Sequence, residues 1–468
     1  MRRGSFAPAT DNPLNSHMKT TLDIVDLAQG GEGVGRTGEG RPVFVPFTAP
    51  GDRVEIDLPG GEGPAHAELV RLERAGPARV APPCRHFGPG PNAACGGCEW
   101  LHLDYAAQLQ AKEQALVETL RRIARLEEGS YRALPIVASP RPLRYRSRAK
   151  FHFDRRTGRL VFFRRRSHEA VQLAECHLLV EELDALREAI GPALGAARLD
   201  PREVTLEWSA RAGRDAAFLQ LAAVTPAARR RAEELLAAVP VLSGVVLGAE
   251  GVPPTLVGDP VLTHERRPGE AALQRSRPDV FQQANRGANA LLVAAALDFL
   301  RPDGQDVLEL YCGAGNFTGP LAARARRVDA VEGQGPALEL ARLDARDAAA
   351  PRAGGDSARA TSNIRFFSGD ALAVARGLAR EQAAIRTYGA ALLDPPRQGA
   401  PGVGAILRAL GVPRVVYVSC DPATLARDLR ACREAGYTVE AIQPVDMFPQ
   451  THHVEVVALL TLRSSSVS

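Results

Sequence analysis

Residues 307–318 have the sequence VLELYCGAGNFT, in which a short apolar run is followed at once by two glycines. A buried parallel strand has such an apolar composition, and Gly313 and Gly315 let the backbone approach a ligand closely before the next helix. A second apolar run ends at Glu332, nineteen residues after Gly313. An acid at that position binds ribose hydroxyls in Rossmann-like folds. The stretch therefore predicts a site for a nucleoside-containing cofactor.

The glycine spacing distinguishes between cofactors. A dinucleotide fingerprint has a third glycine three residues after the second, whereas Gly319 comes one residue late. We therefore favour S-adenosylmethionine over NAD. Asp370 follows the next apolar run and is expected to reach the adenine amino group. The alternative is an ordinary strand–helix turn flanked by solvated acids.

The surrounding chain alternates short apolar runs with helical patterns. The expected strands are 307–310, 328–332, 364–368, 390–393 and 415–418. This alternation predicts an α/β fold with a doubly wound, mostly parallel, Rossmann-like sheet. Ligands bind at the carboxyl ends of the strands in such sheets, and Asp394 follows the fourth run, so we expect Asp394 to border the cofactor crevice. The alternative for Asp394 is a turn-forming Asp-Pro.

Cys420 lies where the fifth predicted strand ends, and a turn and a helix start follow it. Nucleophiles occupy this position in open α/β sheets, and a thiolate is accessible near neutral pH. With the cofactor loop upstream and the carboxylate of Glu455 downstream, the pattern predicts methyl transfer through a covalent cysteine adduct. The alternatives are a buried inert thiol at Cys420 and a solvated strand acid at Glu455.

The rest of the 468-residue chain suggests further domains. Residues 1–18 are polar and are expected to form a disordered leader. Residues 19–78 contain short strand patterns at 21–27, 42–47, 53–58 and 65–72 between Gly-rich turns, which predicts a small, OB-like β-barrel. Residues 79–275 are expected to form a central α+β domain with helices over 104–125, 183–197 and 226–238. Residues 276–468 are expected to form the cofactor-binding domain, with a surface loop at 348–362. No apolar stretch has the length of a membrane span, so we expect a cytoplasmic protein.

Four cysteines in the N-terminal half could share a metal ion or a cluster: Cys84, Cys95, Cys98 and Cys176. The Cys95-Gly-Gly-Cys98 spacing is typical of metal or cluster ligands, or of a redox dithiol, which the missing βαβ context disfavours. Residue types alone do not distinguish zinc from iron–sulfur. Cys312 and Cys432 are expected to be small apolar core residues.

Positive charge is concentrated in residues 141–166, which hold eleven Arg or Lys residues and one acid, Asp154. This basic window carries +10, and since the whole chain carries +4, the remainder carries about −6. Arginines contact phosphate and aromatic rings stack on unpaired bases, so the window predicts RNA binding. For most of its phenylalanines, however, we expect the alternative, which is the inner face of a hairpin.

Five strings in a fixed order carry a resemblance to a known family. They are FQQAN (281–285), YCGAGNF (311–317), LDPPR (393–397), SCDP (419–422) and DMFPQTHHVE (446–455). With these strings the chain resembles the bacterial RNA 5-methyluridine methyltransferase family, and most closely its ribosomal members that carry an N-terminal TRAM domain and an iron–sulfur cluster. The resemblance extends over residues 19–462.

The resemblance implies an S-adenosylmethionine-dependent enzyme that methylates carbon 5 of a uridine in 23S ribosomal RNA. It implies Cys420 as the nucleophile and Glu455 as the base that removes the carbon 5 proton. It also implies that five residues bind the cofactor or border the target base: Gln283, Tyr311, Glu332, Asp370 and Asp394. The cysteines 84, 95, 98 and 176 correspond to 4Fe–4S ligands. The N-terminal barrel corresponds to TRAM, a second RNA contact. We expect a monomer without membrane contact.

The chain departs from the family pattern at three places. Ten residues separate Cys84 from Cys95, Glu309 replaces the usual aspartate, and Asp344 stands where asparagine is frequent. Three rival hypotheses remain: a transfer RNA uracil-5-methyltransferase, a non-catalytic RNA-binding or ribosome-assembly protein, and a small-molecule or protein methyltransferase. The barrel and the four cysteines favour ribosomal RNA, the presence of Cys420 and Glu455 disfavours the second rival, and the basic window disfavours the third.

Overall fold

The computed structural model describes residues 17–90, 95–211, 213–266, 273–349, 363–381 and 388–463. Two compact units make up the chain. Unit 1 comprises the chain up to Ala111 with residues 164–167 and 450–452, and unit 2 comprises the rest. The division into segments 1–18, 19–78, 79–275 and 276–468 stays a prediction. The expected leader, up to residue 16, and most of an expected surface loop at 348–362 lie outside the described residues.

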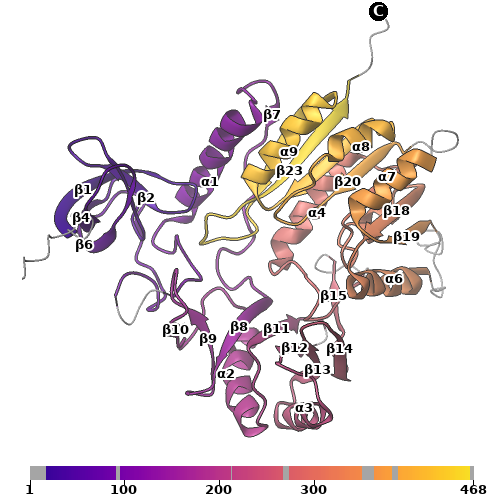
Figure 1. The fold of residues 1–468 in the computed structure, drawn as a ribbon, viewed down its shortest axis with the longest axis horizontal. Helices are drawn as coiled ribbons and strands as arrows, with labels where there is room; N and C mark the ends of the chain where they lie inside the picture. The colour runs from indigo at the N-terminus through magenta and orange to yellow at the C-terminus, as the bar shows by residue number, and fades with distance from the viewer. Residues whose placement is uncertain are drawn as a thin grey trace, which may run out of the picture. The chain divides into compact units, whose positions relative to one another are not determined.

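Unit 1 contains a six-stranded sheet of order β5-β3-β2-β1-β4-β6 (Figure 1). The strands are β1 (His17–Leu27), β2 (Gly33–Arg36), β3 (Pro42–Val45), β4 (Arg53–Pro59), β5 (Ala65–His66) and β6 (Glu68–Arg74). Every second residue of β1 and β4 points into a small core, where Leu22, Ile24, Val54 and Ile56 are buried. Strands β1, β3 and β4 confirm three of the four predicted strands, and the fourth is divided into β5 and β6. Strand β2 was not predicted, and closure of the sheet into a barrel stays a prediction.

The segment after this sheet packs against it within unit 1. The indole N–H of the buried Trp100 donates to the carbonyl of Gly31 at 2.9 Å. Helix α1 (Tyr105–Thr119) begins after Asp104, whose carboxylate accepts a hydrogen bond from the N–H of Ala107 at 2.9 Å, as an N-cap residue does. A π-helical turn, Leu120–Ala124, extends α1 in unit 2. The helix predicted over residues 104–125 is thus confirmed.

The first sheet of unit 2 has the order β10-β9-β8-β11-β12-β13-β14. Its strands are β8 (Arg148–Asp154), β9 (Arg159–Phe163), β10 (Ala170–Val171), β11 (Glu203–Ser209), β12 (Arg214–Gln220), β13 (Leu242–Ala249) and β14 (Val252–Gly258). Helices α2 (Glu181–Ala196) and α3 (Pro226–Ala238) cover it, and both were predicted from the sequence. Thr225 accepts from the N–H of Ala228 and Pro226 begins α3, which explains its sharp start.

The second sheet of unit 2 has the order β19-β18-β17-β20-β21-β23-β22-β7 (Figure 1). Five parallel strands match the five expected from the sequence: β17 (Asp306–Leu310), β18 (Arg327–Glu332), β19 (Ile364–Ser368), β20 (Ala390–Leu393) and β21 (Arg414–Ser419). Three further strands were not expected: β7 (Arg132–Ala133), β22 (Tyr437–Val445) and β23 (Glu455–Leu462). Strand β23 runs antiparallel between β21 and β22, so the sheet is mixed. A separate hairpin joins β15 (Leu262–Glu265) to β16 (Leu273–Ser276).

Helices cover both faces of this sheet, as a doubly wound fold requires. Helices α7 (Ala371–Glu381), α8 (Val403–Ala409) and α9 (Pro422–Glu434) pack on one face, and α4 (Arg286–Leu300), α5 (Thr318–Ala322) and α6 (Gly335–Ala349) on the other (Figure 1). Cys432 is buried in the first core and Cys312 in the second, as predicted for small apolar residues. Among the described helices, none has both the length and the hydropathy to cross a bilayer.

Candidate active site

The order of strands places a topological switch point at the carboxyl ends of β17 and β20. Strands β18 and β19 extend the sheet on one side of β17, and β20 and β21 extend it on the other. Connections that leave in opposite directions open a gap at this switch point, where ligands bind. The N–H of Asp394, directly after β20, donates to the carbonyl of Leu310 at 3.4 Å, which joins the two strand ends.

The cofactor loop after β17 has an unusual backbone. Tyr311 has φ +63°, in the left-handed region that side chains disfavour, and Gly313 and Gly315 have φ +56° and +85°. A Cβ atom at Gly313 would meet no described atom within 4 Å, whereas one at Gly315 would lie 3.4 Å from Ala341. Gly315 thus allows close packing on α6, and the position where a Cβ atom of Gly313 would lie is open.

The acids predicted to bind the cofactor lie at the neighbouring strand ends. The carboxylate of Glu332, at the end of β18, accepts hydrogen bonds from the N–H of Gly313 at 2.9 Å and of Gln334 at 2.7 Å. Glu332 is therefore fixed beside the cofactor loop, as the sequence predicted. The exposed Asp370 follows β19 and accepts from the N–H of Ala373 at 2.8 Å, which makes it the N-cap of α7. Its proposed contact with adenine stays a prediction.

Gln283 is the predicted cofactor residue for which the structure provides least support. It is half-buried between β16 and α4, and within the described part of the chain no hydrogen bond links it to the cofactor loop. Its neighbour Asn285 caps α4 by accepting from the N–H of Ala288 at 3.1 Å. The amide of Asn285 also donates to the carbonyl of Met447 at 3.1 Å. The FQQAN string is thus attached to the segment that precedes Glu455.

Cys420 lies between the end of β21 and the start of α9. The hydroxyl of Ser419 hydrogen-bonds with the backbone of Asp421, and the carboxylate of Asp421 accepts from the N–H of Thr424 at 2.8 Å as the N-cap of α9. Pro422 begins the helix. The backbone therefore turns directly after β21, and the half-buried thiol of Cys420 lies at the carboxyl edge of the sheet.

Glu455 begins β23, beside the strand that ends at Cys420. The last pair of the β21–β23 ladder is Ser419 with Val456, so Cys420 and Glu455 occupy the next positions on the two strands. The side chain of Glu455 is only 2% exposed, which rules out a solvated strand acid. Its Oε2 atom has no hydrogen-bond partner among the described residues. A buried carboxyl oxygen without a partner is costly and is typical of functional sites.

Three acidic groups interact electrostatically at this edge. Burial raises the pKa of Asp394 to about 7. Burial, followed by the charge of Asp394, raises the pKa of Glu455 well above its usual range. Burial, Glu455 and Asp394 together raise the pKa of the Cys420 thiol to about 11. Clusters of groups with perturbed pKa values are characteristic of active sites.

Arg397 was quoted within LDPPR, but no role was assigned to it from the sequence. In the structure its positive charge lowers the pKa of both Cys420 and Glu455, opposing the effect of burial. The guanidinium therefore favours the thiolate and the carboxylate. Two features of the sequence could have indicated a role for Arg397. It lies three residues after Asp394, and it closely follows the carboxyl end of the apolar strand 390–393.

The four predicted cluster cysteines are all half-buried. Cys84, Cys95 and Cys98 belong to unit 1 and Cys176 to unit 2. In the described part of the chain, no three His, Cys, Asp or Glu side chains are grouped as metal ligands are. The 4Fe–4S cluster therefore stays a prediction.

The basic window has a mixed structure. Phe151 and Phe162 stack with ring centroids 4.9 Å apart in the core of unit 2, which confirms the expected inner face of the β8–β9 hairpin. Several cations of the window form ion pairs, among them Arg148 with Glu207 at 2.6 Å. The exposed Arg156 and Arg159 have no ion pair among the described residues. The surface available for phosphate is thus smaller than the charge count suggests.

Comparisons with known proteins agree with this geometry. The family model described as tRNA (Uracil-5-)-methyltransferase matches residues 266–463, and the TRAM domain model matches residues 19–58, which confirms the predicted TRAM domain. A solved structure of Pyrococcus abyssi tRNA (uracil-54, C5)-methyltransferase in complex with S-adenosyl-L-homocysteine superimposes with a TM-score of 0.68 at 21% identity. The match covers 94% of this chain and 99% of that one, and it shows a shared fold.

Curated relatives extend the match over almost the whole chain. The 23S rRNA (uracil(1939)-C(5))-methyltransferase RlmD of Pseudomonas entomophila is 34% identical over 463 residues, covering 96% of this chain and 95% of the relative. RlmD of Pectobacterium atrosepticum is 33% identical over 448 residues, covering 94% and 93%. The chain therefore belongs to the family of RNA uracil-5-methyltransferases that includes RlmD.

Proposed function

We propose that this protein transfers a methyl group from S-adenosylmethionine to carbon 5 of a uridine in 23S ribosomal RNA, through a covalent adduct on Cys420. The observation that supports this most is the arrangement of Cys420, Glu455 and Asp394 at one edge of the sheet, next to the cofactor loop. RlmD relatives with more than 30% identity support ribosomal RNA as the substrate.

The reaction begins at Cys420 because carbon 5 of uracil is a weak nucleophile by itself. The Cys420 thiolate forms a bond to carbon 6, and the electrons of the carbon 5–carbon 6 double bond move toward oxygen 4 as an enolate. Arg397 favours the thiolate that this step requires. S-adenosylmethionine, when bound, would supply the electrophilic methyl group for carbon 5, with its sulfur–methyl bond breaking and S-adenosylhomocysteine as the leaving group.

Glu455 completes the reaction. Its carboxylate takes the proton from carbon 5, the double bond re-forms, and the carbon–sulfur bond breaks to release the Cys420 thiolate. Burial and Asp394 raise the pKa of Glu455, so its ionised form is a stronger base than an ordinary glutamate. Its 2% exposure excludes water, which protects the adduct from competing protonation.

The predicted cofactor residues bind and orient the cofactor and the target base. We propose that Glu332 binds the ribose hydroxyls, Asp370 the adenine and Asp394 the base or the cofactor, with Tyr311 and Gln283 along the same crevice. The open space at Gly313 and the fixed carboxylate of Glu332 support this assignment. The target uridine must leave its base stack to reach Cys420.

We also propose that Cys84, Cys95, Cys98 and Cys176 bind a structural 4Fe–4S cluster. The Cys-x-x-Cys spacing, the half-buried thiols and the resemblance to iron–sulfur members of the family support it. Elemental analysis of anaerobically purified protein tests it, with about four irons and four sulfides per chain expected. Stoichiometric zinc without sulfide would contradict the proposal.

RNA binding is proposed for the TRAM domain and for the exposed arginines of the basic window. We further propose a cytoplasmic monomer, for which size-exclusion chromatography should give a mass near 50.0 kDa. A dimer mass would contradict the monomer.

Covalent trapping tests the proposed mechanism directly. RNA with 5-fluorouridine at the target position cannot lose fluorine as a cation, so the methylated adduct should persist on a denaturing gel with wild-type protein and be absent with Cys420→Ala. A Cys420→Ala protein that still forms the adduct would exclude Cys420 as the nucleophile. Cys432→Ala, which removes a thiol buried away from the site, serves as the control.

A further inference from the structure

The loop between β22 and β23, residues 446–454, leads directly to Glu455, and we call it the base loop. Its first half is held by buried polar side chains of unit 2. The carboxylate of Asp446 accepts a hydrogen bond from Nζ of Lys112 at 2.6 Å, and neither side chain has exposed surface. Nζ of Lys112 also donates to the carbonyl of Phe448 at 3.1 Å. The start of the base loop is thus fixed by one buried ion pair.

Residues 450–452 of the base loop belong to unit 1 and have their own contacts there. Gln450 has φ +71°, a strained value for a residue with a side chain. Its N–H donates to Oε1 of Gln108 at 2.9 Å, and its own Oε1 accepts from Nε2 of Gln108 at 3.0 Å. Its carbonyl accepts from the N–H groups of Glu99 at 2.9 Å and Trp100 at 3.0 Å. Four hydrogen bonds therefore maintain the strained conformation.

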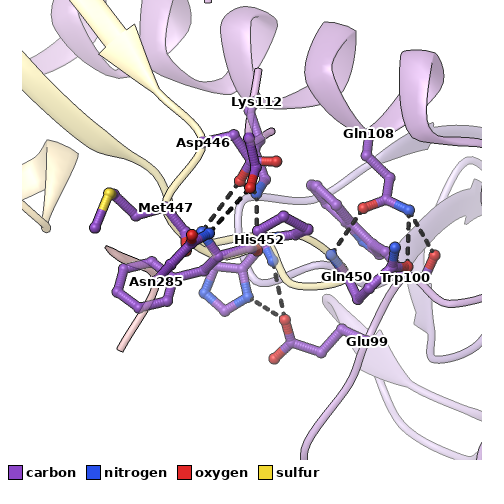
Figure 2. Close-up of polar contacts among 12 residues, drawn as sticks. Glu99, Trp100, Gln108, Lys112, Asn285, Asp446, Met447, Gln450 and His452 are labelled. Atoms are coloured by element: carbon purple, nitrogen blue, oxygen red, sulfur yellow. Dashed lines mark hydrogen bonds and ion pairs between the residues drawn. The ribbon is translucent and has the colours of Figure 1, made fainter. Parts of the chain in front are cut away.

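Glu99 contacts the base loop close to the catalytic strand. Its Oε2 atom accepts from the N–H of His452 at 3.0 Å and lies 2.6 Å from Nδ1 of the same residue (Figure 2). The two side chains are 22% and 25% exposed, so the pair is largely shielded from water. One carboxylate that binds both the main chain and the ring fixes the backbone of His452 as well as its rotamer. Glu455 follows only three residues later.

We propose that Glu99 is a positioning residue for Glu455, acting through His452 and the base loop. The inference rests on the proposed function, in which Glu455 removes the carbon 5 proton. A general base must lie within hydrogen-bond distance of its proton, and a displacement of about 1 Å can lower a rate about 100-fold. Because Cys420 belongs to β21 and not to the base loop, loss of Glu99 slows proton removal and leaves thiolate addition intact.

The test uses the full-length variants Glu99→Ala and His452→Ala, labelled S-adenosylmethionine and an unmodified 23S RNA fragment. We expect kcat to fall at least about tenfold and KM for RNA to fall in proportion, so that kcat/KM changes less than about twofold, because proton removal follows the irreversible methyl transfer. A labelled protein–RNA adduct should accumulate on a denaturing gel, as expected for Glu455→Gln, because addition and methylation then outpace release. If Glu99 had only a structural role, its loss would lower the rates of addition, methyl transfer and proton removal together, and no adduct would accumulate.

Three further variants make the test specific. The double variant Glu99→Ala/His452→Ala should be no slower than the slower single variant, because both remove the same contact. Glu99→Gln can still accept from the N–H of His452 and should retain more activity than Glu99→Ala. Glu118→Ala is the matched control, since Glu118 is 53% exposed on α1 and, among the described residues, its ion pair is with Arg121. It should behave as wild type.

The outcomes separate this inference from the proposed function. Unchanged turnover in both single variants, or slower turnover without adduct, would overturn the role of Glu99. Because Glu99 adjoins Cys98, a proposed cluster ligand, iron content is measured in parallel, and His452→Ala decides the outcome if Glu99→Ala loses iron or fails to fold. If wild-type protein methylates no RNA and Glu455→Gln traps no adduct, the proposed function fails together with this inference.

Discussion

The last pair of residues in the β21–β23 ladder is Ser419 with Val456. Cys420 follows Ser419 and Glu455 precedes Val456, so the two residues occupy opposite positions just beyond the ladder. Opposite positions in an antiparallel ladder are separated by about 5 Å between Cα atoms, so hydrogen bonding of the sheet itself brings the thiol and the carboxyl together. Strand β23 lies between β21 and β22 and runs antiparallel to β21. Because of this direction, the first residue of β23 lies at the same edge of the sheet as the last residues of the parallel strands. The mixed sheet is therefore a requirement of the site.

Removing the base should separate methyl transfer from product release. In Glu455→Gln the amide cannot accept the carbon 5 proton, so methylated RNA is expected to remain attached to Cys420, with kcat reduced about 100-fold or more. A denaturing gel with labelled S-adenosylmethionine measures the adduct. Normal turnover by Glu455→Gln would mean that another group removes the proton.

Activity should rise with pH. The thiolate is the reactive form, and because the pKa of Cys420 is raised to about 11, its population grows as pH increases from 6 to 9. Arg397 lowers that pKa, so Arg397→Ala should raise it, shift the rising limb of kcat/KM to higher pH and reduce activity about tenfold at pH 7. Arg430→Ala, on the exposed surface of α9, is the control. A pH profile that is identical in Arg397→Ala would contradict the electrostatic role.

The buried pair beneath the base loop should contribute strongly to stability. Lys112→Met leaves the fully buried Asp446 without its cation, which should lower the free energy of unfolding by about 3–5 kcal/mol. Lys112→Met combined with Asp446→Leu should recover much of that loss, because neither charge is then buried. Urea titration followed by circular dichroism measures both. Arg121→Met, at an exposed pair, should change stability by less than about 0.5 kcal/mol. A change of less than about 0.5 kcal/mol in the free energy of unfolding of Lys112→Met would contradict a stabilising role for the buried pair.

RNA affinity should depend on the two exposed arginines of the basic window. Arg156→Ala and Arg159→Ala should each weaken binding and reduce the slope of log affinity against log salt by about one. Fluorescence anisotropy with a 23S fragment between low and moderate KCl measures the slope, with Arg430→Ala as control. A slope that stays the same in the double variant would exclude this part of the hairpin from the RNA interface.

Local sequence patterns were sufficient for much of the fold. Each of the five parallel strands is an apolar run of four to six residues, and helices such as α3 begin at residues with clear capping chemistry, Thr225 and Pro226. The cofactor loop was also predictable, because Gly313, Gly315 and Glu332 are linked by spacing that the strand–helix unit imposes. The structure places Glu332 beside the N–H of Gly313, and its contact with a cofactor stays a prediction.

Pairing between distant segments was not predictable in the same way. Strand β23 is apolar like its parallel neighbours, and nothing in its own residues specifies that it runs antiparallel beside β21. The charge of the basic window was overestimated as a phosphate surface because ion pairs such as Arg148 with Glu207 join residues 59 positions apart. The support of the base loop by Glu99, Gln108 and Lys112 depends on contacts across more than 330 positions.

The most direct test of the central claim is methyl transfer from labelled S-adenosylmethionine to unmodified 23S ribosomal RNA, with transfer RNA and the Cys420→Ala variant in parallel. We predict label in 23S RNA that is recovered as 5-methyluridine and is absent with Cys420→Ala. Label confined to transfer RNA would contradict the proposed substrate. Equal label with the wild type and with Cys420→Ala would contradict the covalent mechanism.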